Sequence, residues 1–256
     1  MTRPALDLRL GLGLVSLGRV WGVAQTVPPD DEAAQRLLEA AWTLGIRIFD
    51  TAPAYGASEA RLGRFLRSRA EAEAASAFVM TKAGEEWDEA KGGSRVNHTR
   101  DALRRSIDRS FDRLGRIDVL QVHKGTRDVV GHPDVASALA YARERGVSGF
   151  GASVTDMEAG RVAIETGLYG FLQFPFNRAN PELADLVALC RRKGVVPVIN
   201  RPFAMGALVT EGPFEAAAQE AFGFLKREVG SGIVLTGTGK AAHLAENVEA
   251  FHRSDP

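Results

Sequence analysis

Short apolar runs alternate with longer amphipathic segments along most of the chain. The runs are rich in β-branched and aromatic residues, and glycine, proline or polar residues bound them, which is typical of buried strands. The predicted strands are 8–17, 46–50, 78–82, 117–123, 147–153, 171–174, 195–200 and 232–236. The segments between them have helical periodicity. Predicted helices end at Gly45 and Gly146, and others cover 58–68, 99–114, 156–166, 181–193, a part of 214–229, and 241–251.

Eight strand–helix units at roughly 30 residues each are the count expected of a (β/α)8 TIM barrel. A doubly wound parallel sheet is the alternative, because the number of strands does not prove that the sheet closes. No repeat, linker or shift in composition marks a second domain, so the sequence predicts one barrel over residues 1–256. Gly11 and Gly13 do not form a dinucleotide fingerprint, since Ser16 stands where its third glycine would be needed.

Composition adds limits on partners and location. The 256 residues are 45% hydrophobic, and 32 basic residues balance 32 acidic ones, so no charge excess indicates nucleic acid or an anionic membrane as partner. A small-molecule ligand is favoured instead, and oligomeric state is not indicated. The single cysteine, Cys190, lies in a helical apolar pattern that favours a buried packing role. Neither a signal peptide nor an apolar run of about 18 residues is present, so we expect a cytoplasmic protein.

Candidate chemistry begins in the segment 46–63, where a buried strand ends on an acid, Asp50. Tyr55 follows five residues later, in a loop that Pro53 and Gly56 keep irregular, and Ser58 is a candidate N-cap for the next helix. Parallel α/β folds place their active sites at the carboxyl ends of strands. In isolation, an acid and a tyrosine at such a place are more often structural, through local hydrogen bonds and ring packing.

Two further strands also end on ionisable side chains, Lys82 on the third and His123 on the fourth. If these strands are neighbours in a barrel, both groups face the same mouth as Asp50 and Tyr55. We then expect Asp50 to hold the Lys82 ammonium, and the ammonium to lower the pKa of Tyr55 from its usual value of about 10. His123 could orient a carbonyl group or share a proton.

In their order along nearly the whole chain, these motifs resemble the aldo-keto reductase family. The most specific one is Phe-Asp-Thr-Ala-Pro-Ala-Tyr-Gly-Ala-Ser-Glu at 49–59. The others are Leu62-Gly63, Thr81-Lys82, the segment 106–123, Leu172-Gln173, Gly237-Thr238 and Glu246-Asn247. Within the family, the chain is most similar to bacterial reductases and sugar dehydrogenases.

The resemblance implies a (β/α)8 barrel that binds a nicotinamide cofactor, usually NADPH, and passes hydride directly to a carbonyl carbon. It implies that Tyr55 is the general acid and that Asp50, Lys82 and His123 support it. For the cofactor, it implies contacts from Ser153, Gln173, Arg201, Pro202, Phe203, Gly237, Thr238, Gly239, Lys240, His243 and Asn247.

The sequence departs from the family pattern at the expected adenosine site. Many NADPH-specific members have a lysine and an arginine that bind the 2′-phosphate, and here Gly237 and His243 stand at those places. Lys240 could compensate, because one flexible ammonium can still meet a phosphate. We therefore expect NADPH as cofactor, with NADH possible. Arg201 stands where an aromatic or small polar residue is frequent, which leaves stacking on the nicotinamide open.

Three aromatic residues are candidates for a substrate pocket, and each could instead serve packing alone: Trp21, Trp87 and Phe176. Histidines outside the catalytic set show no metal-ligand spacing with cysteine or acids, so no metal is expected.

The resulting hypothesis is an NADPH-dependent reductase of aldehydes or ketones, acting on a small-molecule carbonyl or sugar substrate. One alternative is an NAD-linked sugar or alcohol dehydrogenase, and another is a non-catalytic regulatory module that binds nicotinamide. The identity of the substrate and the physiological direction are not encoded in a recognisable motif.

Overall fold

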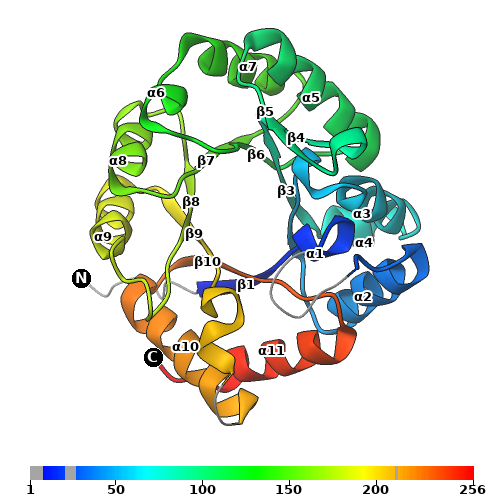
Figure 1. Ribbon diagram of the computed structural model, residues 1–256, viewed down its shortest axis with the longest axis vertical. Helices are drawn as coiled ribbons and strands as arrows, with labels where there is room; N and C mark the ends of the chain where they lie inside the picture. Colours follow the sequence, from blue (N-terminus) through cyan, green and yellow to red (C-terminus); the bar gives the residue numbers. More distant parts are fainter. Residues whose placement is uncertain (1–7, 21–26, 211–212) are drawn as a thin grey trace.

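The computed structural model describes residues 8–20, 27–210 and 213–256. Eight parallel strands form a closed barrel in the order β1-β10-β9-β8-β7-β6-β3-β2 (Figure 1). The strands are β1 (Leu8–Gly13), β2 (Ile48–Asp50), β3 (Phe78–Ala83), β6 (Val119–Val122), β7 (Gly149–Ser153), β8 (Phe171–Pro175), β9 (Val196–Asn200) and β10 (Gly232–Thr236). Closure excludes the doubly wound sheet and confirms the predicted (β/α)8 barrel.

Helices surround the strand ring (Figure 1). The longer ones are α2 (Asp31–Thr43), α3 (Ser58–Arg67), α5 (Arg100–Leu114), α7 (Pro133–Glu144), α8 (Met157–Glu165), α9 (Ala184–Lys193), α10 (Phe214–Val229) and α11 (Ala241–Arg253). Short helical segments are α1 (Val15–Gly18), α4 (Glu71–Ala75) and α6 (Arg127–Val130), with 3₁₀ turns η1 (Pro53–Tyr55), η2 (Glu89–Lys91) and η3 (Ala204–Val209). Within the described ranges, no helix is long and apolar enough to cross a membrane.

Two predictions about the connections were wrong. The opening apolar run 8–17 is not one strand, because the chain leaves β1 after Gly13 and enters helix α1. The segment between the predicted strand 78–82 and the predicted helix 99–114, in which no element was expected, contains an antiparallel hairpin, β4 (Glu85–Asp88) paired with β5 (Gly93–Val96).

A small apolar cluster fills the inside of the barrel. It links side chains from five different strands, which only the barrel interior can bring together: Ile48, Met80, Val119, Val198, Ile233 and Leu235. A much larger core lies between the strands and the helices, and it includes Trp42. Cys190 also lies in this core, as the sequence predicted. Because both faces of the strands are buried, their sequences are apolar runs rather than alternating patterns.

The inward-facing positions change from apolar to polar toward the carboxyl ends of the strands. Two residues beyond the cluster members Ile48, Met80, Val119 and Val198, on the same face of each strand, stand Asp50, Lys82, Gln121 and Asn200. Side chains two positions apart on a strand share a face. The apolar cluster is therefore the floor of a polar mouth.

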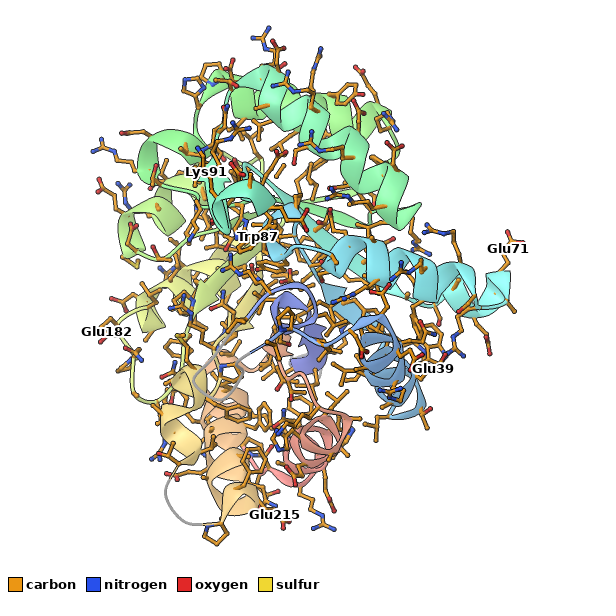
Figure 2. All side chains as sticks on the ribbon, turned by 45° about the vertical axis from the view of Figure 1, so that its right-hand side comes forward. Glu39, Glu71, Trp87, Lys91, Glu182 and Glu215 are labelled. Atoms are coloured by element: carbon orange, nitrogen blue, oxygen red, sulfur yellow. The ribbon has the colours of Figure 1, made fainter. Side chains whose placement is uncertain are left out.

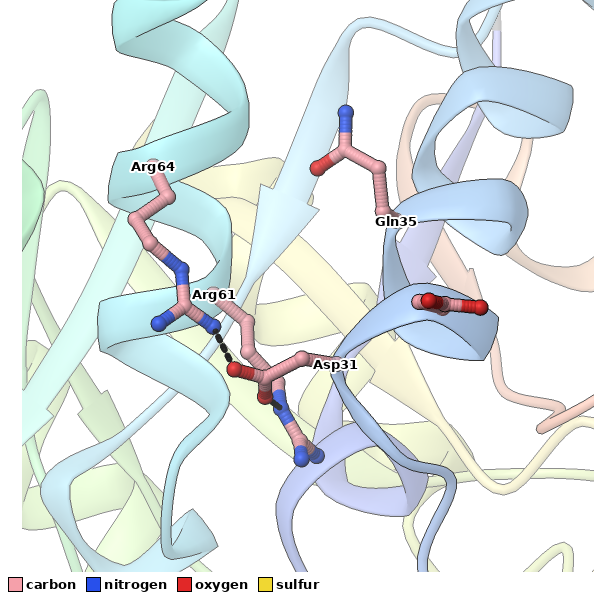
Figure 3. Close-up of a pocket in the computed structure, with 5 residues that line it drawn as sticks. Asp31, Gln35, Arg61 and Arg64 are labelled. Carbon is pink, nitrogen blue, oxygen red and sulfur yellow. Dashed lines mark hydrogen bonds and ion pairs between the residues drawn. The ribbon is translucent and has the colours of Figure 1, made fainter.

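On the outer surface, α2 and α3 are joined by ion pairs around Asp31 (Figure 3). Arg61 Nε lies 2.8 Å from Asp31 Oδ1, and Arg64 Nη2 lies 2.6 Å from Oδ2. The hydrogen bond from Arg61, together with Arg64, holds the pKa of Asp31 below its ordinary value. Arg61 also donates to the Leu17 carbonyl of α1, so this residue connects α1, α2 and α3.

Close packing of α3 against α5 depends on Gly63. A Cβ at this position would lie 1.8 Å from the carbonyl oxygen of Arg113 on α5. Within a helix, alanine is favoured over glycine by about 1 kcal/mol. Helix propensity therefore favours alanine at position 63, and the close contact with α5 disfavours it.

We expect Gly63→Ala to lower the free energy of unfolding by about 1–3 kcal/mol, because the added methyl group must displace backbone rather than a flexible side chain. Urea denaturation measures this, and Gly131→Ala is the control, since a Cβ at Gly131 meets nothing within 4 Å. Equal or higher stability of Gly63→Ala would show that α3 and α5 are not packed this closely.

Candidate active site

A buried ion pair lies at the centre of the polar mouth. Lys82 Nζ, from β3, lies 2.6 Å from Asp50 Oδ2 at the end of β2 and donates to the Thr51 carbonyl at 3.0 Å. Gln121 Nε2, from β6, donates to Asp50 Oδ1 at 2.8 Å. Burial alone would lower the pKa of Lys82, but Asp50 and Tyr55 outweigh it and raise the pKa above its ordinary value of 10.5. Lys82 is thus a fixed cation, and the expected contact with Asp50 is present.

Tyr55 ends the 3₁₀ turn η1 and lies beside this pair. Lys82 Nζ is 5.1 Å from the centre of the Tyr55 ring. The ring of His123 lies 5.9 Å away, centre to centre, in an edge-to-face arrangement. The four residue types predicted from the sequence therefore meet at one place.

Two glycines let α1 approach the Tyr55 turn at backbone distance. A Cβ on Gly18 would lie 1.6 Å from the Tyr55 carbonyl oxygen, and one on Gly56 would lie 2.3 Å from the Gly18 carbonyl oxygen. Gly56 also has a positive φ of 56°, a conformation that other residues rarely adopt. Glycine at both positions fixes where Tyr55 stands.

The net direction of the Tyr55 pKa shift differs from the prediction. Burial raises the pKa of Tyr55 above its ordinary value of 10.0, and this exceeds the lowering by the Lys82 ammonium. The prediction considered the neighbouring charge and not the loss of water around the phenol. At neutral pH, Tyr55 is therefore a protonated phenol, the form that can donate a proton.

Ser58 does not cap α3, contrary to prediction. Ala57 is the N-cap residue and its side chain makes no capping bond. The Ser58 hydroxyl instead donates to the Leu14 carbonyl at 3.0 Å and lies 2.9 Å from the Thr51 hydroxyl. It therefore joins the end of β1 to the segment that carries Asp50.

The glutamate of the same motif, Glu59, lies on α3, in the helix layer outside the strands, and supports the site from there. It is fully buried, and its Oε1 accepts from the hydroxyls of Thr81 and Ser110, each at 2.7 Å. Arg113 Nη1 lies 3.0 Å from its other oxygen. Because Thr81 precedes Lys82 on β3, this network fixes the strand that presents the lysine.

His123 follows β6 and is tied down through its backbone. Its N–H donates to the Ala83 carbonyl at 2.8 Å, and its carbonyl oxygen lies 2.7 Å from His98 Nε2. Burial, with further contributions from Lys82 and other cations, holds the pKa of His123 well below its ordinary value of 6.5. The imidazole is therefore neutral at neutral pH.

The β4–β5 hairpin brings Trp87 to the site. Figure 2 shows Trp87 near the centre of the molecule in that view, whereas Glu71 and Glu215 lie at its rim. The Arg19 guanidinium lies 5.8 Å from the centre of the Trp87 ring and 5.9 Å from that of Tyr55. Trp87 therefore lies beside the candidate site. This position agrees with the interpretation of Trp87 as a candidate pocket residue.

The other two pocket candidates differ. Phe176 is fully buried and packs against Phe224 with ring centres 5.5 Å apart, so it belongs to the core and offers no surface to a substrate. Placing it in the pocket was wrong because the residue after β8 turns into the helix layer. Trp21 lies outside the described residues.

The residues expected at the nicotinamide lie at the end of β7, within β8 and directly after β9. Ser153 and Gln173 are direct partners in the β7–β8 register. At the end of β9, Asn200 has a buried Oδ1 that lacks a hydrogen-bond partner. Buried polar atoms without partners are rare in native proteins, and a bound water, ion or ligand is one explanation for them.

The chain after Asn200 has an unusual backbone. Arg201, Ala204 and Met205 have positive φ values of 56°, 48° and 61°. Such strain in non-glycine residues concentrates at ligand-binding sites. Arg201 is exposed and Pro202 buried. Phe203 packs against Phe222 with ring centres 5.0 Å apart, so its ring is engaged with α10.

The residues expected at the adenosine end surround the start of α11. Gly237, Thr238 and Gly239 connect β10 to this helix, and Lys240 is its N-cap residue. Lys240 and His243 are both exposed. Asn247 donates from Nδ2 to the Thr236 hydroxyl at 2.9 Å, and its Oδ1 is buried without a partner.

The two sets of candidates occupy adjacent arcs of one mouth. The catalytic set comes from β2, β3 and the end of β6, and the cofactor set from β7 to β10, which follow in the barrel order. Among the described residues, no three His, Cys, Asp or Glu side chains are placed to hold a metal ion.

The sequence interpretation missed three residues at the mouth: Gln121, Arg19 and Glu85. Strand alternation could have found Gln121, which stands two positions before His123. Arg19 and Glu85 carry no such signal, because their positions depend on α1 and on the unpredicted hairpin.

Comparison with known proteins gives one consistent result. A family model described as aldo/keto reductase matches residues 9–222. D-threo-aldose 1-dehydrogenase from a Pseudomonas species is 35% identical over 186 residues, which is 57% of this chain and 50% of that protein. L-galactose dehydrogenase from Arabidopsis thaliana is 28% identical over 220 residues, 80% of this chain and 65% of that protein. The chain thus covers half to two thirds of these relatives.

A solved structure assigned as an aldo-keto reductase from Pseudomonas aeruginosa matches over nearly the whole fold. Its TM-score is 0.81 at 28% identity, with 98% of this chain and 94% of that chain covered. The holo form of an aldo-keto reductase from Bacillus halodurans also has a TM-score of 0.81, but at 20% identity it supports the fold alone.

The neutral, buried His123 predicts a pH dependence of stability. In the unfolded chain it takes up a proton near pH 6.5, and in the folded chain only at much lower pH. The unfolded state binds more protons between these two pH values. The contribution of His123 to the free energy of unfolding is therefore fully present above about pH 6.5. Below that pH, the free energy of unfolding falls by up to about 1.4 kcal/mol per pH unit.

Urea denaturation between pH 5 and 7.5 measures this slope, and His123→Asn should remove most of it. The control is His252→Gln, an exposed histidine on α11, which should keep the wild-type slope. Identical slopes for wild type and His123→Asn would mean that His123 takes up its proton equally in both states.

Proposed function

Because this chain belongs to the aldo/keto reductase family, we propose that it is a nicotinamide-dependent oxidoreductase that interconverts a carbonyl group and an alcohol. The observation that carries the proposal is the convergence of Tyr55, Lys82, Asp50 and His123 at the carboxyl mouth of the barrel. In a (β/α)8 barrel, this end of the strands holds the active site.

In this proposal, Tyr55 is the general acid. Its phenol is protonated at neutral pH, and the adjacent Lys82 cation stabilises the phenolate that forms when the proton leaves. Asp50 keeps the ammonium in place, and Gln121 and Thr51 satisfy the remaining hydrogen bonds of the pair. His123 is neutral and close enough to Tyr55 to contact the same substrate oxygen.

The other arc of the mouth fits a nicotinamide dinucleotide. Asn200 Oδ1 and Asn247 Oδ1 are buried acceptors without partners, a state that costs roughly 1–3 kcal/mol each. A carboxamide or an adenine amino group has the N–H donors that they lack. A bound reduced nicotinamide would supply the hydride, and Ser153 and Gln173 would orient its carboxamide.

We propose NADPH as the preferred cofactor, with NADH as the alternative. The N-terminus of α11 offers unpaired backbone N–H groups to a phosphate. Lys240 is exposed there and adds a positive charge. The exposed His243 provides only a weak substitute for an arginine, which is why the preference should be modest.

A second candidate is oxidation of a sugar hydroxyl in the reverse direction. The relatives named as D-threo-aldose and L-galactose dehydrogenases favour it. Rates measured in both directions, on aldehydes with reduced cofactor and on aldoses with oxidised cofactor, distinguish these two functions.

We expect Tyr55→Phe to reduce turnover by a factor of about 10² to 10⁴, because the phenol proton is lost while the ring remains. Cofactor affinity should change little, since Tyr55 lies outside the arc from β7 to β10 that carries the cofactor candidates. Steady-state rates on a panel of aldehydes and aldoses, with cofactor titrations of both proteins, measure the two effects.

The matched control is Tyr141→Phe, which removes a hydroxyl that donates to Asp108 Oδ1 at 2.6 Å in the helix layer. It should turn over like the wild type. Near-wild-type rates for Tyr55→Phe would contradict the assigned role, and tight cofactor binding without turnover on any substrate would favour the regulatory module instead.

A further inference from the structure

A small cavity of about 60 Å³ lies between helix α5 and the β4–β5 hairpin, which are neighbours in Figure 1. One water molecule needs roughly 10–15 Å³ of such space, so the cavity has room for about four waters or for one ion of the size of phosphate. The side chains that line it come from the hairpin segment and from the helix: Glu86, Arg95, Asn97, Ala102, Arg105 and Arg109.

One face of the hairpin is turned to the mouth of the barrel. Glu85 Oε2 lies 3.1 Å from His123 Nδ1, and the centre of the Trp87 ring lies 5.8 Å from the Arg19 guanidinium. The Ser94 hydroxyl of β5 donates to Glu85 Oε1 at 2.5 Å on the same face. Because side chains alternate along a strand, the residues between these face away from the mouth.

The other face of the hairpin is turned to α5. Glu86, between Glu85 and Trp87, forms an ion pair with Arg109 of the helix. Arg95 stands directly opposite Glu86 in the β4–β5 register, so its side chain lies on the same face. The cavity is the space between this face and α5.

The helix contributes one small residue and two cations to the cavity. Ala102, Arg105 and Arg109 are spaced three and four residues apart, so they share one face of α5. The single methyl group of Ala102 leaves the space between helix and hairpin open. Arg105 and Arg109 are one turn apart, and like charges at this spacing repel each other.

Positive charge exceeds negative charge around the cavity. Three guanidinium groups and one carboxylate line it, and that carboxylate, Glu86, is paired with Arg109. In the part of the chain that the structure describes, neither Arg95 nor Arg105 forms an ion pair. The nearby acid of α5, Asp108, is paired with Arg145 instead. An anion in the cavity would balance the two remaining cations and relieve their repulsion.

We propose that this cavity binds a phosphate group, either inorganic phosphate or that of a small ester, between Arg95, Arg105 and Arg109. A guanidinium can donate two parallel hydrogen bonds to phosphate oxygens, and such charge-assisted bonds are among the strongest in proteins. Asn97 supplies a further donor. Its Oδ1 accepts from the Thr99 N–H and hydroxyl, which leaves its Nδ2 to donate to the ligand.

Phosphate in this cavity would join the hairpin to α5 through side chains from both. Glu86 faces the cavity and the next residue, Trp87, faces the mouth, so one strand links the two places. The cavity is separate from the cofactor candidates on the arc from β7 to β10. Binding there requires neither cofactor nor turnover.

Calorimetric titration of the full chain with inorganic phosphate, at an ionic strength held constant with sodium chloride, tests the site. We expect one saturable site with a Kd on the order of 1 mM or tighter. Arg95→Gln and Arg105→Gln should each weaken binding about tenfold, because each removes a charge-assisted hydrogen bond. Both residues are exposed, so both variants should fold.

The matched control is Arg104→Gln. Arg104 is an exposed neighbour of Arg105 on α5, but its guanidinium lies 4.9 Å from the centre of the Tyr141 ring and does not line the cavity. It should bind phosphate like the wild type. An equal loss of affinity in Arg104→Gln would show attraction by the general charge of α5 and would overturn the proposal.

Glycerol 3-phosphate, titrated in the same way, distinguishes the two sources of the phosphate group. Tighter binding of the ester would identify an ester as the ligand, and tighter binding of inorganic phosphate would identify the free ion. If neither ligand binds saturably at tens of millimolar, the proposal is wrong.

Hydrogen exchange of the β4–β5 amides, followed by mass spectrometry, is the second readout. Saturating phosphate should slow this exchange several-fold in the wild type and in Arg104→Gln, and should have much less effect in Arg105→Gln at the same concentration. Unchanged exchange despite saturable binding would refute the link between the cavity and the hairpin.

Discussion

The buried pair of Lys82 and Asp50 is the constraint on which the rest of the site depends. Two charges this deep are tolerated only when their hydrogen bonds are satisfied, and removing one partner of such a pair generally costs about 3–5 kcal/mol. Gln121 and the Thr51 carbonyl complete the set here. The pair therefore fixes β2, β3 and β6 relative to one another, and it places a permanent cation beside Tyr55.

The polar mouth is a consequence of strand alternation in a closed barrel. The same inward face carries Ile48 and then Asp50, and Met80 and then Lys82, so the apolar floor and the reactive layer are two levels of one pattern. Behind the strands, the buried Glu59 joins β3 to α5, and glycines at 18 and 56 bring α1 against the Tyr55 turn. The site is rigid because several independent contacts determine each of its parts.

Local sequence was sufficient to predict the barrel and the residues that end its strands. Asp50, Lys82 and His123 each follow an apolar run, so their convergence required only that neighbouring strands be parallel. Prediction failed where long-range packing decides. Burial raises the pKa of Tyr55 by more than the nearby Lys82 cation lowers it. Ser58 donates to the Leu14 carbonyl instead of capping its own helix. Glu85 could not be found, because a hairpin that resembles a loop in sequence carries it to His123.

The central claim is that the arc from β7 to β10 binds a nicotinamide dinucleotide beside Tyr55. The most direct measurement is a calorimetric titration of the purified protein with NADPH and with NADH. The account predicts one site per chain for NADPH and weaker binding of NADH. The absence of binding by either cofactor would contradict it, because the buried Oδ1 atoms of Asn200 and Asn247 would then lack partners for some other reason and the enzyme would lack its hydride donor.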